Sequence, residues 1–357
     1  MEDAEDNEKL IAERKERAKL YAKREAQEKL FQENLFQTRE ACVYLKERGI
    51  SKATVEAWGI GYVSGRVMIP LRDSQGRTVA FTGRALGEQM PKYKNSPTDL
   101  LYDKSKLVFG LDKAIPSIRK TREVVICEGQ FDVIKLHQEG IENVVACSGT
   151  ALTMQQVEAL VKRCGAERVV LCFDGDRAGE QAALKAMDKL KGLALSKAID
   201  LRILSLNAGD DPDSLCRERG ATYVKAVFAQ APDWIEWRLR MILRGVDPQQ
   251  LDTLGPAEVA IKDLMSVLPA GPRRAWLERE VTDKLGQAPK VKPAAPVVTK
   301  KQRDAIRWAE RRAVRTYLLL PESRIELAGM KLSTPPYELA WSLIQYIESC
   351  GDPSKVA

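Results

Sequence analysis

The 357-residue sequence contains a single histidine, His137, and this scarcity excludes most histidine-dependent chemistry. A Ser-His-Asp triad or a His-rich metal site would have to be built around that one imidazole. The histidine falls within residues 131–139, whose pattern predicts a helix, and a surface or half-buried helical histidine is the expected role. If the protein is an enzyme, its chemistry is therefore expected to depend on carboxylates.

Cysteine is also sparse and irregularly placed. The seven cysteines are odd in number and widely spaced, so neither a disulfide framework nor a CxxC zinc motif is present in the pattern. Cys127, Cys147 and Cys172 lie in apolar runs, where a buried thiol is the expected state. We expect no zinc site in this chain.

Long apolar runs are missing as well. No stretch approaches the ~20 residues of a membrane-spanning helix, and the acidic start Met1-Glu2-Asp3 lacks a signal-peptide pattern. These features predict a cytoplasmic protein with no membrane partner. The sequence also has no Gly-x-x-x-x-Gly-Lys-Ser/Thr loop, which argues against a fused helicase motor.

Positive charge is concentrated in one segment. Residues 60–120 hold eleven lysines and arginines against five acidic residues, an excess close to the net charge of +7 of the whole chain. A basic face of this kind can bind phosphates. Judged from charge alone, an ordinary solvated surface is an equally good interpretation.

The amino-terminal part reads as helices followed by a small sheet. Residues 1–37 are rich in helix formers and predict a charged helical arm. Within residues 38–120 we expect a basic α+β subdomain. Its predicted elements are a helix from Glu40 closed by Gly49, a helix capped by Ser51 that runs through Trp58, and strands at 66–72 and 78–82 joined by a turn at 73–76.

From residue 121 the pattern becomes an alternation of strands and helices. Apolar strands are predicted at 122–127, 143–147, 168–173 and 200–206, with helices at about 131–140, 153–163 and 178–191 between them. This alternation predicts an α/β fold over residues 121–218, a parallel sheet with helices on both faces. Helical segments at 219–287, an extended linker at 288–301 and a small helical unit at 302–357 complete the expected organisation.

Acidic residues follow three of the predicted strands. Glu128 ends the first, Asp174-Gly-Asp176 ends the third, and Asp211-Pro-Asp213 follows the fourth closely. Because the carboxyl ends of parallel strands share one edge, these carboxylates are expected to meet there. Their mutual repulsion requires a cation, and oxygen ligands favour Mg²⁺ or Mn²⁺ over zinc. Two such ions suit nucleotidyl transfer or phosphodiester hydrolysis.

Glu128-Gly129 and Asp174-Gly-Asp176-Arg-Ala-Gly resemble the Toprim domain. Further motifs resemble bacterial DnaG-type DNA primases, among them Cys127-Glu-Gly-Gln-Phe-Asp132, Gly209-Asp-Asp-Pro-Asp-Ser214, Arg66-Val-Met-Ile-Pro-Leu-Arg-Asp73, Phe81-Thr-Gly-Arg84, Pro91-Lys-Tyr-Lys-Asn-Ser-Pro97 and Leu107-Val-Phe-Gly-Leu111. The resemblance covers roughly residues 20–285. It implies a Toprim parallel sheet flanked by helices, with the basic α+β subdomain before it and helical subdomains after it.

The resemblance also implies site residues. Glu128, Asp174 and Asp176 would be catalytic, and the metal-binding set would add Asp132, Asp211 and Asp213, holding two or more Mg²⁺ or Mn²⁺ ions. The residues implied to line a groove for the template or the nucleotide are Arg66, Arg84, Lys92, Asn95 and Lys104. Tyr93 is equally compatible with stacking on a base and with packing.

The implied function is DNA-templated synthesis of short RNA primers from ribonucleoside triphosphates on single-stranded DNA. The implied partners are the template, the nucleotides and a replicative helicase, which the carboxy-terminal region would contact. The protein is expected to act as a monomer at a bacterial replication fork, and a phage or organelle origin stays open. The family's amino-terminal zinc ribbon is not recognisable, the chain is short between Tyr62 and Arg66, and the helicase-binding segment matches only in part. A Toprim nuclease or topoisomerase and a non-catalytic scaffold are the alternatives.

Overall fold

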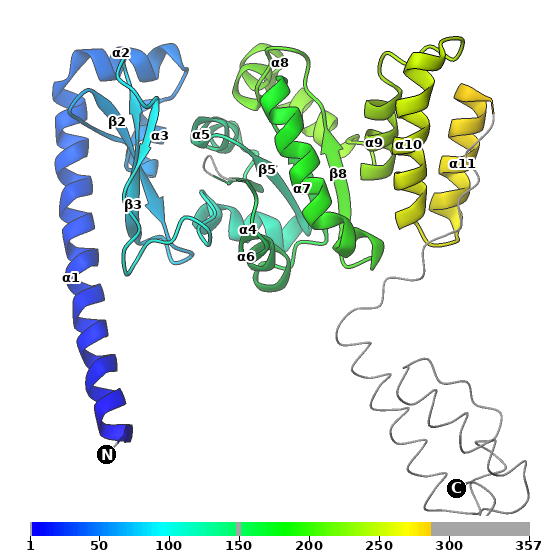
Figure 1. Cartoon of the computed structure of the whole chain (residues 1–357). Coiled ribbons are helices and arrows are strands. Elements are labelled where there is room, and N and C mark those ends of the chain that lie inside the picture. Colours follow the sequence, from blue (N-terminus) through cyan, green and yellow to red (C-terminus); the bar gives the residue numbers. More distant parts are fainter. Residues whose placement is uncertain (1, 148–150, 287–357) are drawn as a thin grey trace, which may run out of the picture. The chain divides into compact units, whose positions relative to one another are not determined.

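The computed structural model describes residues 2–147 and 151–286. The predicted linker at 288–301 and the predicted helical unit at 302–357 lie outside the described residues. Within the described part, an antiparallel sheet and a parallel sheet, each of four strands, are followed by a group of helices (Figure 1). The expected fold class, a helix-flanked parallel sheet preceded by an α+β part and followed by helices, is confirmed.

Residues Glu2–Gln37 form one continuous helix, α1. Its amino-terminal half extends past the sheet on which the rest of the helix lies (Figure 1). The carboxy-terminal half packs closely: Leu35 is buried, and the Phe31 ring lies edge-on to Phe81 with 5.2 Å between the centroids. An ion pair of 2.6 Å between Arg24 and Asp99 adds a polar tie. The second half of α1 is therefore part of the core of the antiparallel-sheet region.

Two short helices follow, as the sequence predicts. They are α2, Arg39–Glu47, and α3, Lys52–Trp58. The side chain of Ser51 caps α3 by accepting a hydrogen bond from the Thr54 amide at 3.1 Å. Gly59 closes the helix in the left-handed conformation.

The first sheet is antiparallel with the strand order β1-β2-β3-β4. The two predicted strands are confirmed as β2, Arg66–Arg72, and β3, Thr78–Ala85, the latter three residues longer than expected. Two strands of three residues each, β1 (Gly61–Val63) and β4 (Tyr93–Asn95), were not predicted. Neither is long enough to show an alternating pattern.

The second sheet is parallel with the order β6-β5-β7-β8, which confirms the predicted α/β arrangement. Its strands are Glu123–Cys127 (β5), Val144–Ala146 (β6), Arg168–Cys172 (β7) and Asp200–Leu204 (β8). Residues alternate between two cores along each strand, so that Val124 faces one core and Val125 the other. Cys127 and Cys172 are buried, as expected.

Helices cover both faces of the parallel sheet. One core contains residues of α5 (Gln130–Gln138) and α8 (Pro212–Ala229), and the other contains residues of α4 (Leu111–Thr121), α6 (Met154–Glu158) and α7 (Arg177–Leu195). Helix α4 was not predicted from the sequence, because Pro116 within it is normally a helix breaker. The chain continues α6 as one π-helical turn, Ala159–Arg163.

Three further helices follow α8: α9 (Trp234–Leu243), α10 (Leu251–Val267) and α11 (Pro272–Leu285). Trp234 and Trp237 of α9 are buried in the core shared with the parallel sheet. In the described ranges, no helix is both long and apolar enough to cross a membrane.

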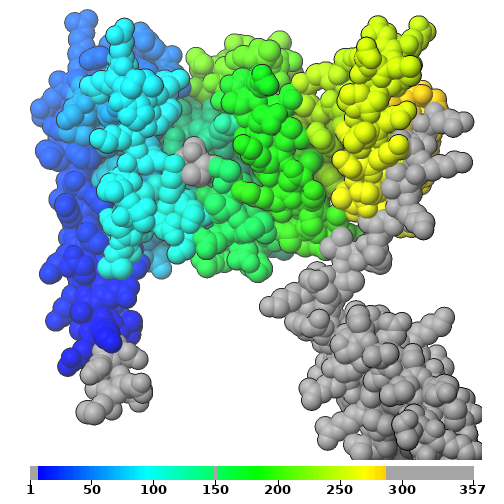
Figure 2. Space-filling model, in the orientation of Figure 1, coloured from blue at the N-terminus to red at the C-terminus, as the bar shows by residue number. Residues whose placement is uncertain are grey.

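The two sheet regions are joined by direct contacts, and their surfaces run together in the space-filling view (Figure 2). The side-chain oxygen of Gln138 in α5 accepts hydrogen bonds at 2.8 Å from both the Ser51 amide and the Thr54 hydroxyl. The ring of His137, also in α5, lies 5.2 Å from the Trp58 ring, and its Nε2 is 2.8 Å from the Val144 carbonyl. The single histidine is thus a half-buried packing residue, as expected.

Candidate active site

The topology of the parallel sheet brings two acidic segments together. Strands β5 and β7 are neighbours, and their connections leave toward α5 and α7, which belong to opposite faces. Such a point, where adjacent connections diverge, opens a crevice at the carboxyl edge of the sheet. Glu128 follows β5 and Asp174 follows β7 closely, so both carboxyl groups lie at this edge.

The third acidic segment reaches the same edge through backbone contacts. The amide of Gly175 donates a hydrogen bond of 2.8 Å to the Asp210 carbonyl. A Cβ atom at Gly175 would lie 1.9 Å from the Asn207 carbonyl oxygen, so only glycine permits this approach. Asp211 then caps α8, accepting a hydrogen bond of 2.6 Å from the Ser214 amide.

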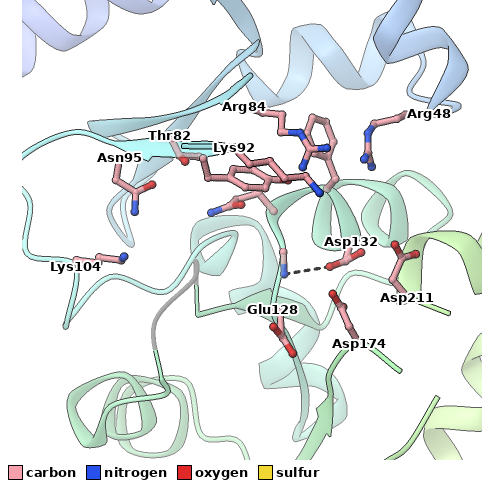
Figure 3. A pocket seen from close by; sticks show the side chains of 14 residues that line it. Arg48, Thr82, Arg84, Lys92, Asn95, Lys104, Glu128, Asp132, Asp174 and Asp211 are labelled. Carbon is pink, nitrogen blue, oxygen red and sulfur yellow. Dashed lines mark hydrogen bonds between the residues drawn. The ribbon is translucent and has the colours of Figure 1, made fainter. Parts of the chain in front are cut away.

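Glu128, Asp174 and Asp211 line a cavity of about 380 Å³ whose walls carry opposite charge. Figure 3 shows basic and polar side chains of the antiparallel-sheet region on one side and carboxylates of the parallel sheet on the other. The acidic side, called the acidic rim below, consists of Glu128, Asp132, Asp174 and Asp211. The opposite side, called the basic wall, consists of Arg84, Lys92, Asn95 and Lys104.

Partial burial and mutual repulsion dominate the electrostatics of the acidic rim. Burial, followed by the neighbouring Asp174, raises the pKa of Glu128 to about 7. Burial and the nearby Asp211 and Asp176 raise the pKa of Asp174 to about 6, against a lowering influence of Lys92. The pKa of the buried Asp132 is raised well above its usual range for the same reasons.

Two rim oxygens are buried without any hydrogen-bond partner, namely Oε1 of Glu128 and Oδ1 of Asp174. Unpartnered carboxylate oxygens beside like charges are suited to a divalent cation. Within the described residues no group of three or more His, Cys, Asp or Glu side chains is placed so that it could hold a metal ion by itself. An open arrangement is compatible with Mg²⁺, which usually takes one or two carboxylates and completes its shell with water and phosphate oxygens. The rim therefore fits a divalent cation.

Two of the predicted acidic residues lie outside this cavity. Asp176 caps α7 by accepting a hydrogen bond of 2.7 Å from the Gly179 amide, and it lines an adjoining hollow that it shares with Asp174. Asp213 is 1% exposed and forms ion pairs of 3.2 Å with Arg48 and with Arg217. Rim residue Asp132 is itself buried, 3.1 Å from the Gly129 amide that donates to it.

Among the predicted basic residues, Arg66 is the one that does not line the cavity. Its guanidinium donates hydrogen bonds to the carbonyls of Gly83, at 3.1 Å, and Pro91, at 2.9 Å. These bonds tie β2 to the segment that carries Lys92. Arg66 therefore supports the backbone of the basic wall and is not part of the cavity lining.

Sequence reasoning missed several lining residues, notably Arg48 and Thr82. Thr82 pairs with Asn95 across β3 and β4, and Arg84 pairs with Tyr93, so all four share one face. The Arg84 guanidinium lies 4.9 Å from the centroid of the Tyr93 ring. The available signal was the spacing of two residues between Thr82 and Arg84, which puts both on one side of a strand.

Comparison with known proteins matches this arrangement. The Toprim domain family matches residues 122–199, and the family described as DNA primase catalytic core, N-terminal domain, matches residues 63–115. Over both segments the chain is similar to DnaG-type primases. It is 36% identical to a DNA primase of Synechococcus elongatus over 312 residues, which cover 79% of this chain and 44% of that protein. It is 33% identical to the DNA primase of Escherichia coli K12 over 221 residues, 62% of this chain and 38% of that one.

Solved structures of DnaG-type primases share the fold. A DNA primase domain from Pseudomonas aeruginosa superposes with a TM-score of 0.64 at 29% identity, covering 75% of this chain and 96% of that one. A DnaG primase catalytic domain bound to single-stranded DNA gives a TM-score of 0.64 at 28% identity, covering 76% and 98%. The chain spans less than half the length of the two curated primases named above. The match to the Toprim domain and the similarity to primases imply use of a divalent metal.

Gly179 packs so closely against Asp174 and Glu128 that no side chain fits at this position. A Cβ atom there would lie 2.2 Å from the Asp174 carbonyl oxygen and 2.9 Å from Oε1 of Glu128. We expect Gly179→Ala to lower the free energy of unfolding by about 1–3 kcal/mol. Gly192→Ala in the same helix meets nothing within 4 Å and should instead raise it, by about 0.5–1 kcal/mol. Urea unfolding of both variants checks the contrast, and equal effects would contradict the close packing of Gly179.

The raised pKa values of the rim predict how stability depends on pH. Protonated carboxyl groups favour the folded state below pH 4, and that advantage is lost as pH rises through the folded-state pKa values of about 6 for Asp174 and 7 for Glu128. The metal-free protein should therefore be less stable at pH 8 than at pH 5.5. Mg²⁺ should raise Tm more at pH 8, on the order of 2–4 °C.

Asp174→Asn should stabilise the metal-free protein at pH 8 and shrink the Mg²⁺-dependent rise in Tm. Asp263→Asn, the same change at an exposed position in α10, is the matched control and should alter neither quantity. Thermal melts with and without Mg²⁺ measure both. A Mg²⁺ response in Asp174→Asn equal to that of the parent protein would show that the rim does not take the cation.

Proposed function

We propose that this chain is the catalytic part of a DNA primase, which synthesises short RNA primers from ribonucleoside triphosphates on a single-stranded DNA template. The observation that carries the proposal is the cavity in which the acidic rim faces the basic wall. A polymerase that adds nucleotides needs carboxylates to hold cations and, beside them, positive charge to hold phosphates. One cavity of this chain contains both.

We assign the binding of two or more Mg²⁺ or Mn²⁺ ions to Glu128, Asp174, Asp176 and Asp211, with the more deeply buried Asp132 as a further member of the set. Bound ions would supply neutralisation of the phosphate charge and activation of a hydroxyl nucleophile. Glu128, Asp174 and Asp176 are the residues we propose as catalytic. Their contribution is to hold charge in place before the substrate arrives, and the caps at α7 and α8 keep two of the carboxylates oriented.

We assign the phosphates of the template and of the incoming nucleotide to the basic wall. Arg84, Lys92 and Lys104 can neutralise phosphate oxygens without reading bases, as expected of an enzyme that accepts nearly any template. Asn95 adds a neutral hydrogen-bonding group beside them, and Tyr93 lies against Arg84 at one end of the wall. Arg66 supports the wall through its bonds to the backbone.

The proposed setting is a bacterial replication fork, where the chain would act as a monomer. The carboxy-terminal unit at 302–357, outside the described residues, is the proposed contact for a replicative helicase. Support for the template comes from a related DnaG catalytic domain whose structure was solved bound to single-stranded DNA.

Templated incorporation of a labelled ribonucleotide on single-stranded DNA tests the function directly. The protein should extend RNA only when Mg²⁺ or Mn²⁺ and a template are both present. Asp174→Ala and Glu128→Ala should each lower the rate by at least about 100-fold, because each removes preorganised charge at the reacting phosphates. Asp263→Ala serves as the control. Normal incorporation by the two rim variants would refute the assignment.

The same reaction mixture distinguishes primer synthesis from the main alternative, which is cleavage of nucleic acid. A Toprim nuclease or topoisomerase-like enzyme would cleave the labelled nucleic acid in the presence of Mg²⁺ without incorporating nucleotides. The two curated relatives and the two solved structures described above are primases, which supports synthesis rather than cleavage.

The basic wall is tested by two neighbouring lysines. Lys92 lines the cavity and Lys94 does not, although both are exposed and close in sequence. Lys92→Met should weaken binding of single-stranded DNA or nucleotide and make that binding less sensitive to salt, because one phosphate contact is lost. Lys94→Met carries the same loss of charge and should have a smaller effect. Fluorescence anisotropy over a range of salt concentrations provides the measurement, and equal losses would indicate a diffuse surface effect.

A further inference from the structure

We propose that Asp213 is a positioning residue, which ties the acidic rim to the antiparallel-sheet region through Arg48, and that it does not bind the metal. The proposal rests on the proposed polymerase function. The family resemblance puts Asp213 among the metal ligands together with Asp211, two residues earlier. The surroundings of the two side chains differ sharply.

Asp213 is enclosed between two guanidinium groups. Its side chain is 1% exposed, and Oδ2 accepts a hydrogen bond of 3.2 Å from Nη1 of Arg48. Oδ1 accepts no hydrogen bond and is compensated by charge alone, with Nε of Arg217 at 3.2 Å. It does not line the cavity of the acidic rim. A divalent cation would have to displace one arginine and lie beside the other, which Coulomb repulsion opposes. Asp213 is therefore unsuited to metal binding.

Asp211 has the opposite environment. It lines the cavity, and the Ser214 amide occupies one of its oxygens, Oδ1, at 2.6 Å. The second oxygen remains available to a cation. The two carboxylates of a single short motif thus face different surroundings: one the cavity, the other a pair of arginines.

Arg48 is held by three elements at once. It belongs to the end of α2, where its Nε donates a hydrogen bond of 2.7 Å to the Tyr44 hydroxyl. Its guanidinium lies 4.6 Å from the centroid of the Phe131 ring, in the first turn of α5. The third contact is Asp213 in the first turn of α8. Both the helix that follows Glu128 and the helix that Asp211 caps are therefore fixed to α2.

This arrangement sets the distance between the two walls of the cavity. The basic wall belongs to the same sheet region as α2, and two residues of the acidic rim, Glu128 and Asp211, stand just before α5 and α8. Loss of the Arg48–Asp213 pair would leave the rim carboxylates together, because the Gly175–Asp210 backbone bond still holds Asp211 at the sheet edge, but it would loosen α2 and the basic wall relative to them. Displacements of the order of 1 Å can lower a reaction rate by about 100-fold. The expected defect is therefore in the chemical step and not in metal binding.

The experiment compares the parent protein with Asp213→Asn, Asp211→Asn and Asp233→Asn. Asp233 is the matched control, because it also lies at the start of a helix and forms a 3.2 Å ion pair with an arginine, Arg273, but does not line the cavity of the acidic rim. Mn²⁺ binding is measured by electron paramagnetic resonance, and Tm is measured in parallel. Ribonucleotide incorporation gives kcat and KM.

We expect Asp213→Asn to bind Mn²⁺ within about twofold of the parent protein while its kcat falls about 10–100-fold. Asp211→Asn should weaken Mn²⁺ binding at least tenfold, and Asp233→Asn should change only Tm. Arg48→Met combined with Asp213→Asn should be no slower than the slower single variant, because the two residues act as a unit.

Loss of Mn²⁺ binding in Asp213→Asn comparable to that in Asp211→Asn would overturn the proposal by making Asp213 a ligand. A kcat unchanged from that of the parent would overturn it by leaving Asp213 a purely structural role, and additive losses with Arg48→Met would separate the two residues. If the parent protein itself incorporates no ribonucleotide, the polymerase function fails, yet the Mn²⁺ comparison still decides whether Asp213 binds metal.

Discussion

Repulsion among partly buried carboxylates is the constraint around which this region is organised. Glu128 and Asp174 are brought together because parallel strands end at one edge. Burial, and then the repulsion between neighbouring carboxylates, raises their pKa values to about 7 and 6 and so disfavours the ionised forms. The surrounding structure relieves only part of this repulsion. Helices α7 and α8 begin at the rim, so their amino-terminal dipoles and the caps by Asp176 and Asp211 favour negative charge. The negative charge that these groups leave uncompensated is available to a cation.

The basic wall faces this charge without neutralising it. Among the described residues, no ion pair joins Arg84, Lys92 or Lys104 to the acidic rim, although all line the same cavity. Had these side chains closed onto the carboxylates, a substrate would have to break each pair before binding. Because the cavity keeps the two walls apart (Figure 3), the basic wall stays available to phosphate groups and the acidic rim would be available to hold a cation. The separation between the basic wall and the acidic rim is therefore a functional feature of the site.

Pattern reasoning recovered those features that depend on neighbours in sequence. Apolar runs located β5, β7 and β8, and the acidic residues that follow β5 and β7 located the rim, because parallel strands leave little freedom about where their ends lie. It failed where an element is too short to show a period, as in β4, or contains a misleading residue, as Pro116 does in α4. Basic residues could be counted but not placed: Arg66 binds backbone carbonyls, whereas the unpredicted Arg48 lines the cavity.

The contrast between Asp211 and Asp213 shows why motif resemblance alone leaves residue roles undecided. The sequence Asp211-Pro-Asp213 begins a helix, with Asp211 as the cap, Pro212 in the first helical position and Asp213 in the second. Successive residues around a helix start point in different directions, so two carboxylates separated by one residue cannot serve the same cavity equally. Asp211 is directed to the rim, and Asp213 to an arginine 165 positions earlier in the chain. The fold brings Arg48 next to Asp213, and this contact is the reason to give Asp211 and Asp213 different roles.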